Sequence, residues 1–150
     1  MRLTARETTK IIGALSLAAT GAVHLQQFVR LYHAVPTIGT LFMLNFAGAT
    51  GLALVLLAPI ERLARRRGRL AVVAAAAGGI ALAASSFVFL LISEHTPLFG
   101  FKEPGYDPPA IAAARAAEVA TVLFLGVFLA ARPRRAARRM VISNPRRQPR

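Results

Sequence analysis

Residues 70–92 read LAVVAAAAGGIALAASSFVFLLI, a run of 23 residues without one ionisable side chain. A helix of roughly 20 residues is long enough to cross a hydrocarbon core of about 30 Å. A helix of this length on a soluble protein would carry a polar stripe on its outer face, and this run has none. The run therefore predicts a helix that crosses a membrane.

Three further apolar runs, at residues 11–31, 38–60 and 110–131, are also long enough to cross once. They lead us to expect an all-α integral membrane fold, an up-down bundle of four transmembrane helices. Its domain would cover residues 1–131, and small residues at four-residue spacing would let the helices pack closely. Residues 132–150 would form an Arg-rich tail without fixed structure.

Composition supports this interpretation. The chain is 55% hydrophobic, yet it has 19 Lys and Arg against 6 Asp and Glu, a formal net charge of +13. Apolar and basic residues are thus segregated along the chain, which argues against a soluble enzyme, a disordered chain or a nucleic-acid-binding domain. The absence of Cys excludes disulfides, thiolate metal sites and thiol catalysis.

The basic residues predict an orientation. Sixteen of them lie in residues 2–10, 62–69 and 132–150, whereas the other side would hold only Arg30, Lys102 and Arg115. The positive-inside rule then places both termini and a loop at 61–69 in the cytoplasm of a bacterial cell, with the chain in the plasma membrane. For the Arg-rich segments we expect anionic lipid as the partner, with an acidic protein as the alternative. Nucleic acid is not expected, because no aromatic residue is interleaved to stack on bases.

Polar residues inside the four runs fall at one level. Counting 1.5 Å of helical rise per residue from the outer end of each run places one polar residue of every helix roughly 10 to 12 Å below that end. The candidate pocket consists of His24, Gln27, Asn45, Ser85, Arg115 and Glu118. Arg115 is the simplest partner for Glu118, because i, i+3 residues share a helical face, and His24 is the next simplest.

This layer has two interpretations. In one, the polar groups hydrogen-bond each other and fix the register of the bundle. In the other, they line a cavity that opens to the outer side, where Glu118 and His24 exchange protons or hold a polar ligand.

The expected outer segments 32–37 and 93–109 add the candidates Tyr32, His33, His95 and Glu103. Their spacing lacks a typical pair of metal ligands, so we expect no metal site there. Haem between two histidines is disfavoured, because only His24 is clearly buried. A quinone needs only a few hydrogen-bonding groups, and no motif identifies it or any other cofactor.

Two classes of function follow. The first is a non-enzymatic accessory or scaffold subunit that docks on a larger membrane complex or on further copies of itself. The second is a membrane protein that binds a small ligand, protons or a quinone around His24 and Glu118. In size and four-span plan the chain resembles small bacterial four-helix membrane families such as the DoxX-like proteins, and this resemblance of architecture implies no function.

Overall fold

The computed structural model describes residues 3–131, apart from the side chains of residues 62, 63 and 65. The described part is all-helical, with one isolated β-bridge between Leu98 and Phe101. Its helices are α1 (Ala5–Arg30), the short 3-10 helix η1 (Tyr32–Ala34), α2 (Pro36–Leu57), α3 (Ile60–His95) and α4 (Pro108–Ala130). All four α-helices are long and apolar enough to cross a membrane, as the sequence predicts. The expected tail at 132–150 lies outside the described residues.

Local signals account for the helix starts. Thr4 caps α1, because its hydroxyl accepts from the Glu7 amide while the Glu7 carboxylate accepts from the Thr4 amide. Pro36 begins α2, where a missing N–H removes no helical hydrogen bond. Asp107 caps α4 by accepting from the Ala110 amide.

The basic segment 61–69, expected as a loop, is instead helical and forms the first turns of α3. Five of its nine residues are Arg, and one each are Glu, Leu and Ala. These are all good helix formers, so the charge of the segment does not prevent a helix. The segment is itself not straight, since a Cβ added at Gly68 would overlap the Ile60 carbonyl at its start. A straight helix would separate these two residues by about 12 Å, so α3 bends sharply between them.

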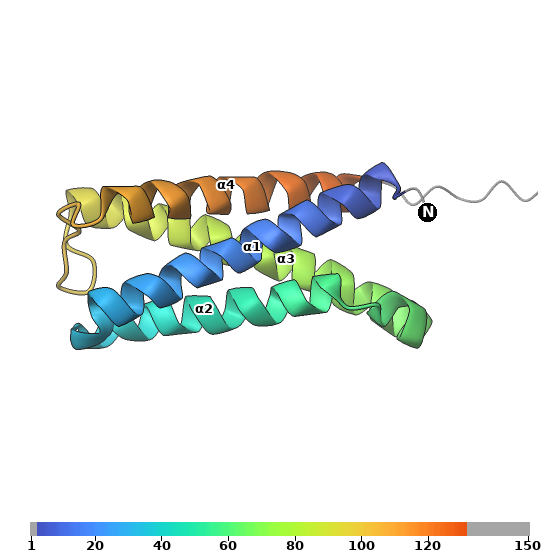
Figure 1. Ribbon diagram of the computed structural model, residues 1–150, viewed down its shortest axis with the longest axis horizontal. Helices are drawn as coiled ribbons and strands as arrows, with labels where there is room; N and C mark the ends of the chain where they lie inside the picture. Colours follow the sequence, from blue (N-terminus) through green and yellow to red (C-terminus); the bar gives the residue numbers. More distant parts are fainter. Residues whose placement is uncertain (1–2, 132–150) are drawn as a thin grey trace, which may run out of the picture.

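The four helices run alternately up and down, as Figure 1 shows, with each helix antiparallel to the next along the chain. α1 and α3 each pack against α2 and α4 and hardly touch one another, so they lie on a diagonal of the bundle. The first and last described turns meet at one end. There Arg6 Nε donates to the Ala131 carbonyl at 3.3 Å, and the Arg6 guanidinium lies 4.1 Å from the centre of the Phe128 ring.

The apolar core fills the half of the bundle near that end. Its buried residues are Ala14, Leu17, Ala49, Ala53, Leu56, Val72, Ala75, Ala76, Leu125 and Phe128. Glycines bring the helices close there, because a Cβ at Gly13 would lie 2.6 Å from Leu125 Cδ2 and one at Gly79 would lie 2.8 Å from Leu17 Cδ2. In lipid, helices associate through this kind of close van der Waals contact rather than through a hydrophobic driving force.

Replacing Gly13 by Ala tests this packing. We expect Gly13→Ala to lower the free energy of unfolding by about 1 to 3 kcal/mol, because the new methyl group overlaps the buried Leu125 side chain. Reversible unfolding in mixed micelles, followed by circular dichroism, measures the change. Gly126→Ala is the matched control, since a Cβ at Gly126 meets nothing within 4 Å. Equal stability of the two variants would contradict the proposed packing.

Candidate functional site

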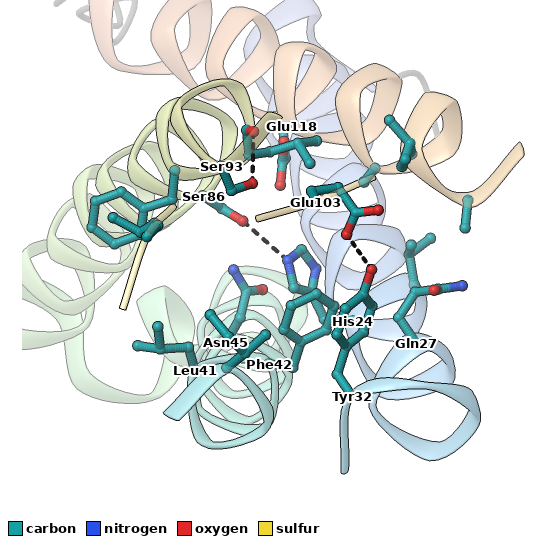
Figure 2. Close-up of a pocket in the computed structure, with 18 of the residues that line it drawn as sticks. His24, Gln27, Tyr32, Leu41, Phe42, Asn45, Ser86, Ser93, Glu103 and Glu118 are labelled. Carbon is teal, nitrogen blue, oxygen red and sulfur yellow. Dashed lines mark hydrogen bonds between the residues drawn. The ribbon is translucent and has the colours of Figure 1, made fainter. Parts of the chain in front are cut away.

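A cavity of about 280 Å³ lies in the other half of the bundle, beside η1 and the 96–107 loop. All four α-helices contribute to its wall (Figure 2). Its volume is near the lower end of the range for small-molecule sites, about 300 to 1,000 Å³. Most of the lining is apolar, and a few polar side chains are placed among the apolar ones.

His24 projects from α1 into this cavity and has both ring nitrogens engaged. Nδ1 lies 2.8 Å from the Thr20 carbonyl, which can only accept, so Nδ1 carries the proton of the neutral ring. Nε2 then accepts from the Ser86 hydroxyl of α3, at 3.0 Å. The hydrogen bonds therefore assign one tautomer to His24 and orient its ring.

Glu118 of α4 is 1% exposed, and its Oε2 has no hydrogen-bond partner among the described residues. Ser86 interacts with the Glu118 carboxyl group as well as with His24, so its hydroxyl stands between the two. The three side chains come together in Figure 2 from three different helices. A protonated Glu118 could donate to Ser86, which in turn donates to His24.

Asn45 of α2 is the second polar group without a partner. It is 7% exposed, and its Oδ1 accepts no hydrogen bond from any described residue. A buried amide oxygen left without a donor costs about 1 to 3 kcal/mol. A ligand or water in the cavity that donates to this oxygen would remove that penalty.

Arg115 does not pair with Glu118 as the sequence analysis expected. Its Nη2 donates to Glu94 Oε1, at 2.6 Å, in the last turn of α3. Arg115 lies almost one helical turn closer than Glu118 to the end of the bundle that carries the 96–107 loop. Its long side chain reaches towards that end, where the ion pair of Arg115 and Glu94 is part-exposed. Glu118 therefore has no ion-pair partner among the described residues, although Arg115 still acts on it electrostatically.

The loop end of the cavity is closed by two side-chain contacts. Tyr32 of η1 donates its phenolic proton to Glu103 of the 96–107 loop, and Gln27 Nε2 donates to Asp107 Oδ2 at 2.8 Å. The Glu103 amide also donates to the Ser93 carbonyl of α3 at 2.8 Å. These bonds tie the loop to α1, η1 and α3.

The environments of these groups shift their proton affinities. Burial, together with the hydrogen bond to Glu103, raises the pKa of the Tyr32 phenol. The hydrogen bond from Gln27, followed by that from the Ala110 amide, lowers the pKa of the Asp107 carboxyl. Asp107 therefore stays ionised near neutral pH, where it both caps α4 and holds Gln27.

Most of the predicted site residues meet at this cavity. His24, Gln27, Asn45, Ser85 and Glu118 line it, and so do Tyr32 and Glu103. Arg115, His33 and His95 do not: His33 is exposed and lies 6.5 Å from the Phe28 ring, and His95 is exposed at the end of α3. The described residues contain no cluster of three metal-ligating side chains.

Four further residues line the cavity that the sequence does not predict there, namely Phe42, Ser93, Phe101 and Asp107. The Phe42 ring stacks on Tyr32 at 4.6 Å, and its centre is 5.0 Å from that of His24. Asp107 carries a signal that could have been used, because an Asp directly before two prolines is typical of a helix N-terminus. The aromatic residues carry no such signal.

Comparison with known proteins adds no relative, because no family model, curated protein or solved structure matches the chain.

Titration of the phenol of Tyr32 tests the closed loop end. We expect Tyr32 to ionise at a higher pH in the folded protein than in the unfolded chain, and Glu103→Gln to move this transition down. Absorbance titration in a Tyr106→Phe background observes Tyr32 alone, since the chain has two Tyr. Because the folded pKa is the higher one, the contribution of this phenol to stability is complete below about pH 10 and is lost as pH rises towards the folded pKa. A transition that Glu103→Gln leaves unchanged would contradict the contact.

Proposed function

We propose that the chain is a multi-pass protein of a bacterial plasma membrane, with the 96–107 loop outside and both termini in the cytoplasm. The exposed apolar side chains of the four helices, such as Leu44, Leu54, Leu70 and Leu123, support insertion because they are between 61% and 63% exposed. The orientation follows from the basic residues. Arg6, Lys10 and the Arg residues at 66–69 lie at the end opposite the 96–107 loop.

We propose further that the cavity binds a small ligand and that Glu118 takes up and releases a proton there. The observation that carries this proposal is a pair of buried oxygens on the wall of one cavity, Glu118 Oε2 and Asn45 Oδ1, which accept no hydrogen bond from any described residue. A layer that only fixed the register of the bundle would satisfy its own hydrogen bonds, as buried polar groups usually do. These two oxygens instead leave two acceptor positions for a bound molecule.

Proton exchange is supported by the contacts of Ser86. An ionised carboxylate without a bonded cation is expensive to bury, so Glu118 is held protonated while the cavity holds no cation. Its proton can pass to the hydroxyl of Ser86, and the proton of that hydroxyl can pass to His24 Nε2. His24 is thus the acceptor that makes release from Glu118 feasible inside an apolar bundle.

A second candidate, the accessory subunit, is favoured by a different surface. An apolar hollow of about 260 Å³ lies between α3 and α4, lined by Ala83, Ala84, Phe87, Val88, Glu118, Val119, Val122 and Leu123. It could receive side chains from a helix of a larger membrane complex or from another copy of this chain. Native mass spectrometry in mild detergent separates the candidates, because a subunit copurifies with protein and a ligand-binding protein with a small molecule.

Cysteine labelling tests the orientation. The chain has no Cys, so single substitutions at the exposed Lys102 and Arg67 each introduce one reactive thiol. In intact cells we expect a membrane-impermeant maleimide to label Lys102→Cys and to leave Arg67→Cys unlabelled until the cells are lysed. The reverse pattern would show the opposite orientation, and labelling of both would argue against insertion.

The infrared spectrum tests the proton on Glu118. In lipid at neutral pH we expect the carbonyl band of a protonated carboxylic acid, shifted in D2O and absent from Glu118→Gln. Glu61→Gln is the control, because Glu61 lies in the first turn of α3, outside the cavity, and this variant should keep the band. A wild-type protein without the band, or a band that persists in Glu118→Gln, would overturn the proposal.

A further inference from the structure

The charge on the cavity wall is opposite to that of the chain. Glu103, Asp107 and Glu118, half of the 6 acidic residues, line the cavity. None of the 19 basic residues is found on this wall in the described part of the chain. Two of these carboxylates already accept hydrogen bonds from protein groups, Glu103 from Tyr32 and Asp107 from Gln27. Glu118 is the one with a buried oxygen that accepts no hydrogen bond from any described residue.

Aromatic rings line the same space. Phe42, Tyr32 and Phe101 form a continuous cluster, with ring centres 4.6 Å apart for the first pair and 5.5 Å for the second. Phe89 of α3 is a fourth aromatic lining residue. The faces of such rings attract cations, and the attraction strengthens when water is excluded. An acidic group and aromatic rings that line one mostly apolar cavity favour an organic cation over a neutral or anionic molecule.

The exposed part of the lining indicates a route into the cavity. Among the described lining residues, those classed as exposed are Leu44 of α2 and Ser85 and Phe89 of α3, and we call them the side opening. They lie on the flank of the bundle, whereas the loop end is closed by the bonds from Tyr32 to Glu103 and from Gln27 to Asp107. If the bundle is inserted as proposed, the side opening faces lipid.

We infer that the ligand of this cavity is a small organic cation with an apolar body, which enters through the side opening and places its charge beside Glu118. This inference rests on the proposed function and names its ligand class. Binding the cation displaces the proton of Glu118, which passes through Ser86 to His24 Nε2 and from the imidazolium to water. One positive charge thus enters and one proton leaves, and only O–H and N–H bonds are broken.

The groups that face Glu118 determine how strongly a proton competes with the cation. α1 contributes His24, which can receive the proton through Ser86 of α3. Arg115 on α4 favours release of the proton but is itself bonded to Glu94 of α3. α2 contributes Asn45, which does not titrate. Cation binding should therefore strengthen as pH rises and Glu118 loses its proton.

Calorimetry on the full chain in lipid nanodiscs tests the ligand class with two probes of one shape. Benzyltrimethylammonium is the cation, and neopentylbenzene is its uncharged carbon isostere. We expect the cation to bind about tenfold more tightly than the isostere, with release of a proton, and Glu118→Gln to remove this preference. Glu61→Gln should bind like the wild type. Equal binding of both probes, or a preference that survives in Glu118→Gln, would overturn the inference.

The same probes distinguish failure of the inference from failure of the proposed function. One possible result is that neopentylbenzene binds, that Asn45→Leu alters its binding, and that benzyltrimethylammonium does not bind. The cavity is then a site for another class of ligand. If neither probe binds and Glu118 shows no protonated band, the proposed function itself is wrong. Either result overturns the assignment of an organic cation.

A matched pair of substitutions tests the route. Leu44 and Leu54 are both on α2 and are 62% and 63% exposed, but only Leu44 lines the cavity. We expect Leu44→Trp to slow proton release on mixing with benzyltrimethylammonium by about tenfold in a stopped-flow measurement with a pH dye, because the indole narrows the side opening. Leu54→Trp should leave the rate unchanged. A rate that is unaffected in Leu44→Trp but rises in Tyr32→Phe would instead place the route at the loop end.

Discussion

For a bundle that is inserted as we propose, the cost of exposing a polar side chain to hydrocarbon is the constraint on which the arrangement depends. A charged group at the centre of a bilayer costs at least about 2.5 kcal/mol, so each helix must turn its polar residue inward. His24, Asn45, Ser86 and Glu118 therefore meet on the bundle interior, one from each helix. Once these four faces are directed inward, the remaining faces are apolar, and the rotation of each helix about its axis is largely determined.

The two halves of the bundle are packed differently. Near the described chain ends, Gly13 and Gly79 let neighbouring helices approach until side chains touch, and the core there is apolar and filled. Near the 96–107 loop, the polar layer and the aromatic cluster around Tyr32 enclose a cavity instead. A filled half supports a rigid frame, and a hollow half with unsatisfied polar groups is suited to binding.

The sequence was a good guide to which residues lie at one depth and a poorer one to their partners. Helical rise alone placed His24, Asn45, Ser85 and Glu118 at one level, and all four line the cavity. Spacing on one helix predicts Arg115 as the partner of Glu118, but Arg115 donates a hydrogen bond to Glu94 on the neighbouring helix. A contact between two helices depends on their crossing and on the reach of long side chains, and neither can be read along one chain. The helical turns at 61–69 do not follow from the sequence either, because a dense run of charged residues by itself predicts a loop.

Hydropathy and residue spacing by themselves determined that this chain forms four long apolar helices, with polar residues in one layer and basic residues mostly at one end. These properties are local, because each depends on the order of residues within one segment. Only the tertiary structure decided that Ser86 lies between His24 and Glu118 and that Tyr32 and Gln27 hold the 96–107 loop. It also decided that Asn45 and Glu118 each keep an oxygen that no part of the described chain hydrogen-bonds. These are contacts between segments far apart in sequence, and they form only when all four helices pack at one rotation and register.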